Sequence, residues 1–142
     1  TRGLAQRGPR ANSGVRWLHE RDLWQEFEEA CEFYLKLRNA QIGKKCIENP
    51  IMHKYAKEKL GKINRQVVQP WWFGEETFKA TGYELHSLDP LQKTNVLAPP
   101  KAGTEQHKAW SWVHRCPPGP MRWKIRSTTP QGIANAMAEQ WG

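Results

Sequence analysis

The feature that most constrains the fold is a short apolar run, Cys46-Ile47, that ends in Glu48-Asn49-Pro50. The run predicts a buried strand over residues 45–48, and the proline predicts the start of a helix that reaches residue 60. A strand followed directly by a helix is typical of an α/β sheet, whose ligands bind at the carboxyl ends of the strands. Glu48 and Asn49 are therefore candidate site residues. The purely structural alternative is that Asn49 only caps the helix.

The rest of the pattern predicts helices and strands on both sides of this corner. Apolar residues at three- and four-residue steps predict a helix over residues 15–39, and Gly61 ends the second helix. Strands are expected over residues 66–69 and 78–85. A last helix begins at Thr129-Pro130, with Ile133, Met137 and Trp141 on its inner face. This order predicts an α/β sheet with at least one parallel crossover and a closing hairpin.

Two further segments have their own character. Residues 87–119 are rich in proline and predict a long loop, either functional or mobile, with one helical turn over residues 105–114. Residues 122–126 alternate basic and apolar side chains, which is typical of an edge strand. Residues 1–10 show no periodicity, so we expect an irregular segment there and one domain over residues 11–142.

The charge and the tryptophan content favour a polyanionic partner. The chain has a formal net charge of +8 and eight tryptophans in 142 residues. Basic groups hold phosphates, and aromatic planes between them stack on unpaired bases. Solvated basic faces and core packing are the structural alternatives. Arg115, Arg122, Lys124 and Arg126 flank the proline-rich loop and are candidate DNA contacts.

Other classes of site find little support. Three cysteines without regular spacing predict a reducing, cytoplasmic compartment and no disulfide framework. No C-x-x-C or H-x-x-x-H pair occurs, so we expect no metal site. No glycine-rich phosphate loop occurs. No apolar run has membrane-spanning length, so no membrane partner is expected.

Six segments together resemble a known family. They are Ala11-Asn12-Ser13-Gly14-Val15-Arg16-Trp17, Ile47-Glu48-Asn49-Pro50, Val68-Gln69-Pro70-Trp71-Trp72-Phe73-Gly74, Phe78-Lys79-Ala80-Thr81, Arg126-Ser127-Thr128-Thr129 and Gly132-Ile133-Ala134. Over residues 11–142 the chain resembles the carboxyl-terminal half of phage and bacterial DNA cytosine-methyltransferase-like proteins.

The resemblance implies a fold, a cofactor and a set of roles. The fold would be the distal half of a Rossmann-like methyltransferase domain, a mostly parallel sheet with a closing antiparallel hairpin and helices on its faces. S-adenosylmethionine would bind in the other half. Glu48 and Asn49 would be the catalytic pair that contacts a flipped cytosine, the glutamate bonding the ring while a thiolate attacks it. Lys79 would lie in a basic, DNA-binding segment, and Pro50, Trp71 and Trp72 would line the substrate pocket.

The chain departs from the family at the two segments that supply the nucleophile and the cofactor-binding turn. Gly8-Pro9-Arg10 stands where the family has its nucleophilic Pro-Cys loop, and the glycine-rich cofactor turn is missing. Without a thiolate the covalent step has no nucleophile, so we expect no methyl transfer by this chain alone. A separate chain could supply the missing half. The alternatives are a non-catalytic basic nucleic-acid-binding protein and a protein-binding module that uses Trp71-Trp72-Phe73.

Overall fold

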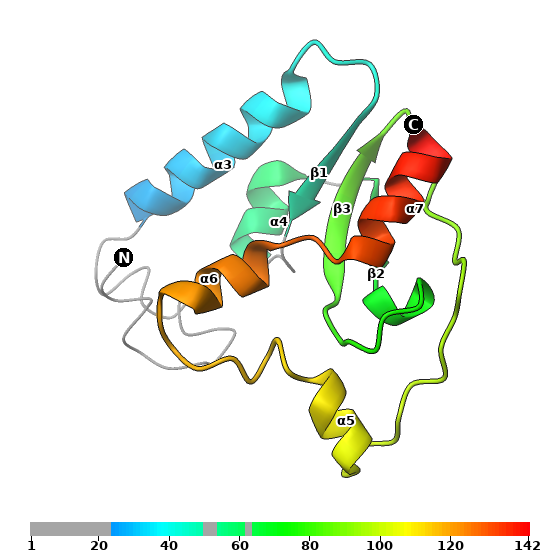
Figure 1. Ribbon diagram of the computed structural model, residues 1–142. Helices are drawn as coiled ribbons and strands as arrows, with labels where there is room; N and C mark the ends of the chain where they lie inside the picture. The colour runs from blue at the N-terminus through cyan, green and yellow to red at the C-terminus, as the bar shows by residue number, and fades with distance from the viewer. Residues whose placement is uncertain (1–23, 50–53, 62–63) are drawn as a thin grey trace. The chain divides into compact units, whose positions relative to one another are not determined.

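The computed structural model describes residues 24–49, 54–61 and 64–142 (Figure 1). Pro50 and the segments predicted over residues 1–10 and 15–23 lie outside the described residues. The chain forms two compact units, one made of Thr1–Gly43 and Ile51–Asn64 and the other of Lys44–Pro50 and Arg65–Gly142.

The first unit contains helices α3 (Trp24–Asn39) and α4 (Lys54–Leu60). Its core consists of buried Cys31 and Leu60, with Phe27, Tyr34, Leu35 and Ala56 packed around them. Gly61 follows α4 with φ +74°, and its N–H donates to the Lys57 carbonyl at 2.9 Å. Glycine adopts this left-handed conformation without a steric cost, so the prediction that Gly61 ends the helix is confirmed.

The second unit is built on three strands, β1 (Lys45–Asn49), β2 (Arg65–Val68) and β3 (Thr81–His86). The order in the sheet is β1-β3-β2, and both neighbouring pairs are antiparallel. The expected partial Rossmann-like fold, with its mostly parallel sheet and parallel crossover, is therefore wrong for the described residues. The reason is that β3 lies between β1 and β2. These two strands run in the same direction but share no hydrogen bonds, so α4 does not connect neighbouring strands.

A short 3₁₀ helix and three α-helices complete the second unit. They are η1 (Pro70–Trp72), α5 (Glu105–Trp110), α6 (Pro120–Ser127) and α7 (Gln131–Trp141). The edge strand predicted over residues 122–126 is wrong, because these residues lie in α6. Pro120 at the first turn favours helix, and Gly119 before it has φ +150°, a conformation that side chains rarely allow.

The core of the second unit lies between the sheet and α7. Val68 and Ile133 are fully buried, together with Phe73, Tyr83, Leu85, Leu91 and Ala136, and Met137 and Trp141 pack against this cluster. The predicted inner face of the last helix is thus confirmed.

Thr104 caps α5, its hydroxyl oxygen accepting from the His107 N–H at 3.2 Å.

Side-chain amides fasten the start of the proline-rich loop to this core. The Gln66 side chain donates to the Leu91 carbonyl at 3.0 Å and accepts from the Leu91 N–H at 2.8 Å. Gln140 makes the same reciprocal pair with the backbone of Gln92, at 2.9 and 2.8 Å. These four hydrogen bonds fix the position of Leu91 and Gln92, which belong to no strand or helix.

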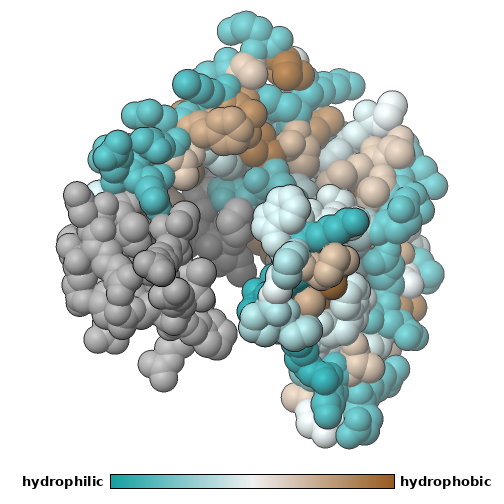
Figure 2. All heavy atoms as spheres, turned by 60° about the vertical axis from the view of Figure 1, so that its left-hand side comes forward, coloured by the Kyte–Doolittle hydropathy of each residue, from teal (hydrophilic) through white to brown (hydrophobic). Residues whose placement is uncertain are grey.

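Hydrophilic residues predominate on the face shown in Figure 2, and hydrophobic residues form small groups among them. In the part of the chain that the structure describes, no helix combines the length and the apolar character that crossing a membrane requires.

Candidate nucleic-acid interface

The carboxyl ends of β1 and β2 lie at the same end of the sheet, one on each side of β3. The register pairs Asn49 with Gly82 on one side of β3 and Val68 with Thr81 on the other. The predicted strand is confirmed and ends in Glu48 and Asn49. The Glu48 side chain is exposed, whereas Asn49 is buried. Of the two residues, only Glu48 is open to a ligand from solvent.

Glu48 shares an open hollow with helix α6. The hollow has a volume of about 470 Å³ and is lined by Glu48, Gly119, Arg122, Trp123, Arg126 and Ser127. We call it the α6 hollow. Trp123 is 76% exposed, the highest exposure among the large hydrophobic side chains of the described residues. One carboxylate, two guanidinium groups and an indole ring therefore face the same solvent-filled space.

The charges in the α6 hollow do not cancel through direct contacts. Within the described ranges, no ion pair joins Glu48 to Arg122 or Arg126. Arg126 donates one bond to the His114 carbonyl at 3.3 Å. The Nε of Arg122 is buried and has no hydrogen-bond partner among the described residues. Two cations against one anion leave the hollow net positive and able to accept an anionic group.

The Glu48 charge also acts on neighbours in the sheet. Burial raises the pKa of the Cys46 thiol to about 11, and Glu48 adds to the effect. Burial, then Glu48 and Cys46, raise the pKa of the Tyr83 hydroxyl well above its usual range. Burial lowers the pKa of Lys79, while Glu48 opposes that shift. Two groups that stay neutral near pH 7, the Cys46 thiol and the Tyr83 hydroxyl, thus lie close to the exposed carboxylate of Glu48.

The raised pKa of Cys46 leads to a prediction about its reactivity. The thiolate is the reactive form, and a pKa near 11 leaves almost all of the thiol protonated at pH 8. We expect iodoacetamide to alkylate Cys46 at pH 8 at least about tenfold more slowly in the folded protein than in urea, with the rate rising up to about pH 11. Peptide mapping by mass spectrometry separates Cys46 from the other cysteines. Equal rates in the folded and unfolded protein would contradict the burial of this thiol.

The other predicted DNA contacts lie in different places. Lys124 is exposed on α6 but does not line the hollow. Arg115 is exposed and donates to the Lys108 carbonyl at 3.0 Å. Lys79 is half-buried and donates to the Thr128 carbonyl, beside a separate cavity. Of the predicted basic contacts, only Arg122 and Arg126 lie together with Glu48.

Trp71 and Trp72 anchor a loop and do not line the α6 hollow. The Trp71 carbonyl accepts from the Leu97 N–H at 2.9 Å, and Lys93 Nζ lies 4.4 Å from the centre of the Trp72 ring. Trp72 also packs against the core, and Phe73 is buried. A protein-binding patch made of these three aromatic residues would need them exposed, so the structure gives that alternative no support.

Sequence reasoning did not single out Trp123, although the signal was present. The segment 122–126 contains three basic residues and one aromatic residue, Trp123. Side chains three or four positions apart lie on one side of a helix, so a helical assignment would have placed Arg126 beside both Arg122 and Trp123. The edge-strand assignment instead placed Trp123 on the face opposite the arginines.

Among the described residues, the turn after β2 is not glycine-rich, and no cluster of metal-ligating side chains occurs. β2 leads through Gln69 into η1 without a glycine, so it lacks the glycine-rich strand-to-helix turn that the cofactor would need. Within the described ranges, no three His, Cys, Asp or Glu side chains lie close enough together to hold a metal ion. No protein-family model, curated protein or solved structure matches this chain.

Proposed function

We propose that this chain is a non-catalytic nucleic-acid-binding protein that holds a single strand on helix α6. The observation that carries the proposal is the arrangement of Arg122, Trp123 and Arg126 around one open hollow. The formal net charge of +8 supports it, since attraction to a polyanion does not depend on sequence.

The three side chains supply the two contacts that such binding needs. Guanidinium groups donate paired hydrogen bonds to phosphate oxygens, and an exposed indole offers a flat surface to an unpaired base. A ring that is 76% exposed gains little from the protein itself, so stacking on a base would stabilise it. These features favour a strand with accessible bases over a closed duplex.

Glu48 has a directing role in this proposal. Its carboxylate repels phosphate and accepts hydrogen bonds from the amino groups of bases. With Glu48 on β1 and the two arginines on α6, the backbone of a strand would follow the helix while base edges turn towards the sheet. Glu48 thus orients the strand without taking part in a reaction.

Catalysis by methyl transfer is not part of this proposal. Cytosine methylation needs a thiolate, and the cysteine nearest to Glu48 in sequence, Cys46, has a pKa of about 11. Cys31 is buried, and burial raises its pKa as well. The resemblance to DNA cytosine-methyltransferase-like proteins remains a prediction, and the parallel sheet that it implied is absent from the described strands.

Removing both arginines of the α6 hollow should weaken binding and its dependence on salt. Each phosphate contact on a single strand contributes about −0.7 to the slope of log K against log salt concentration. We expect Arg122→Gln/Arg126→Gln to reduce the steepness of that slope by about 1.4, and to weaken binding roughly ten- to thirtyfold at 0.1 M salt. Fluorescence anisotropy with a labelled single-stranded oligonucleotide at several salt concentrations measures both quantities.

The matched control removes the same charge from the other unit. Lys36 and Lys57 are exposed on α3 and α4. Lys36→Gln/Lys57→Gln should leave the slope close to that of the unaltered protein. If the two double variants reduce the slope equally, overall charge and not the α6 hollow is responsible. If the unaltered protein does not bind the oligonucleotide at low salt, the proposal fails.

A further inference from the structure

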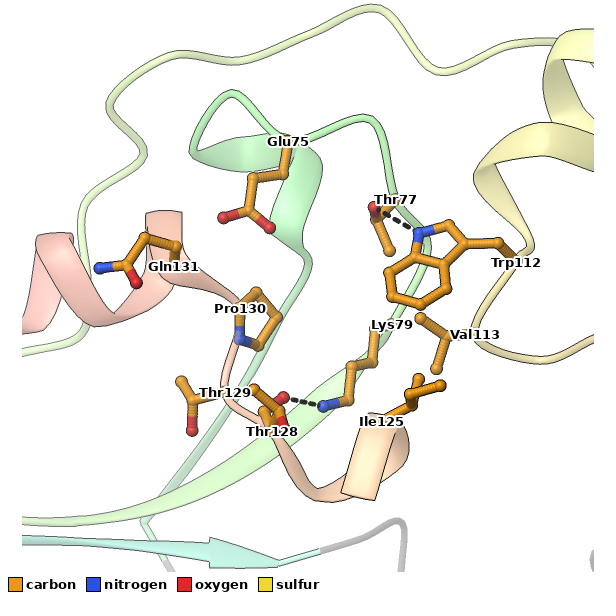
Figure 3. A pocket seen from close by; sticks show the side chains of 10 residues that line it. All are labelled: Glu75, Thr77, Lys79, Trp112, Val113, Ile125, Thr128, Thr129, Pro130 and Gln131. Atoms are coloured by element: carbon orange, nitrogen blue, oxygen red, sulfur yellow. Dashed lines mark hydrogen bonds between the residues drawn. The ribbon is translucent and has the colours of Figure 1, made fainter. Parts of the chain in front are cut away.

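A second cavity lies at the carboxyl-terminal end of α6. It has a volume of about 250 Å³, and its lining comes from the segment before β3, the segment after α5, the end of α6, the start of α7 and the connection between these two helices (Figure 3). Its polar lining consists of Glu75, Thr77, Lys79, Thr128, Thr129 and Gln131, and its apolar lining of Trp112, Val113, Ile125 and Pro130. We call it the Lys79 cavity.

Hydrogen bonds hold three polar side chains of this cavity in place. The Trp112 indole N–H donates to the Thr77 hydroxyl at 3.1 Å, and Lys79 Nζ donates to the Thr128 carbonyl. The Gly132 N–H donates to Glu75 Oε1 at the start of α7. Figure 3 shows Glu75 on one side of the space, Trp112 on the other, and Pro130 and Lys79 between them. The lining is thus fixed by contacts within the protein.

Each of these groups keeps unused hydrogen-bonding capacity towards the cavity. An ammonium has three donors, and Lys79 uses one of them on Thr128 in the described structure. The Thr77 hydroxyl accepts from Trp112 and retains its own hydrogen. Glu75 uses Oε1 for Gly132, and no bond to Oε2 is formed by a described residue. The cavity therefore offers donors and an acceptor side by side.

The walls and the size limit what can fit. The Trp112 ring and the Pro130 ring give flat apolar surfaces, and Val113 and Ile125 lie beside Trp112 and Lys79 (Figure 3). Pockets for drug-sized ligands have volumes of roughly 300–1,000 Å³, so this smaller space suits a single planar ring system. A net anionic ligand is disfavoured by Glu75. A neutral ring with donors and acceptors on its edge matches the lining.

We propose that the Lys79 cavity takes one nucleobase, with Lys79 donating to a carbonyl oxygen or ring nitrogen and Glu75 accepting from an N–H of the base. The inference rests partly on the proposed function. Ile125 of α6 lines this cavity, and Arg122 and Arg126 of the same helix line the α6 hollow. A strand held by the arginines can therefore present a base to the cavity. Burial lowers the pKa of Lys79, in agreement with a partly dehydrated ammonium that would gain from a new acceptor.

The test uses two sources of the base. Isothermal titration of the unaltered protein with cytidine, adenosine, guanosine and uridine probes the free base. Anisotropy with an oligonucleotide, intact or with one abasic position, probes a base within a strand. We expect the abasic position to weaken binding about five- to tenfold with no change in the salt slope.

Two variants connect this loss to the cavity. Glu75→Gln keeps an oxygen for the Gly132 N–H but replaces the second acceptor with a donor, and Lys79→Met removes the donors. In both variants the abasic position should weaken binding clearly less than it does in the unaltered protein, because the cavity no longer contributes to the penalty. Glu76, which follows Glu75 in sequence, and Lys101 are exposed and lie outside the lining. The controls Glu76→Gln and Lys101→Met should keep the full penalty.

The outcomes separate the two proposals. An equal abasic penalty in Glu75→Gln, Lys79→Met and both controls, with no binding of any nucleoside, overturns the cavity proposal while leaving the α6 hollow intact. Nucleoside binding that Glu75→Gln abolishes, with no binding of the oligonucleotide, supports the cavity and overturns the proposed function. A thermal melt of each variant shows whether the fold is kept, and the titration of the unaltered protein needs no variant.

Discussion

Ile133→Ala is expected to lower the free energy of unfolding of this protein by about 2–5 kcal/mol, the range for truncating a large buried aliphatic side chain. Ile133 is fully buried on α7, where it packs with Val68, Tyr83 and Leu85 of the sheet. The alanine would leave a void that these neighbours fill only in part. The higher helix propensity of alanine offsets less than about 0.7 kcal/mol. Urea denaturation followed by tryptophan fluorescence measures the change.

The same substitution at an exposed isoleucine provides the control. Ile42 is 61% exposed in the first unit, and surface substitutions usually change stability by less than about 0.5 kcal/mol. Ile42→Ala should therefore denature at nearly the same urea concentration as the unaltered protein. A loss at Ile133 no larger than that at Ile42 would show that α7 does not cover the sheet as described.

Trp123→Ala should weaken the binding of single-stranded oligonucleotides by about 1–3 kcal/mol, the value of one base stacked on an aromatic side chain. The indole carries no charge, so the loss should be the same at every salt concentration and the salt slope should not change. The ring is 76% exposed in the free protein, so its removal should leave stability nearly unchanged. Anisotropy titrations at three salt concentrations check this result.

Two further substitutions on α6 separate stacking from general hydrophobic contact. Trp123→Tyr keeps a flat ring and should recover most of the affinity. Met121 is 60% exposed on the same helix and has no ring, so Met121→Ala should have little effect. If Met121→Ala weakens binding as much as Trp123→Ala, the contact is not base stacking. If Trp123→Ala binds like the unaltered protein, the indole makes no contact with the strand.

The elements that depend on nearby residues could be predicted from the sequence. The left-handed Gly61 ends α4, and the spacing of Ile133, Met137 and Trp141 gives the inner face of α7. Such signals act over one or two helical turns, so the local sequence contains them. The strand ending in Glu48-Asn49 was found for the same reason.

The order of the strands could not be predicted in this way. Lys45 pairs with His86 and Arg65 pairs with Glu84, partners far apart in the sequence. The valines of β2 and the helix before it are compatible with a parallel crossover. Only the insertion of β3 between β1 and β2 excludes that pairing, and no local pattern records it.

The candidate site was only partly predictable, because it depends on one ambiguous segment. Residues 122–126 alternate basic and apolar side chains, which suits a strand as well as one side of a helix. Pro120 decides for the helix, and α6 then brings Arg122 and Arg126 beside Glu48. The Lys79 cavity combines residues from before β3, after α5 and between α6 and α7, so its composition follows from the tertiary fold alone.

The most direct test of nucleic-acid binding is the salt dependence of the unaltered protein with a single-stranded oligonucleotide. We predict that log K falls linearly with log salt concentration, with a slope of about −1.4 or steeper, since at least the two arginines of the α6 hollow would contact phosphates. Binding that is absent at low salt, or that does not change with salt, would contradict the account.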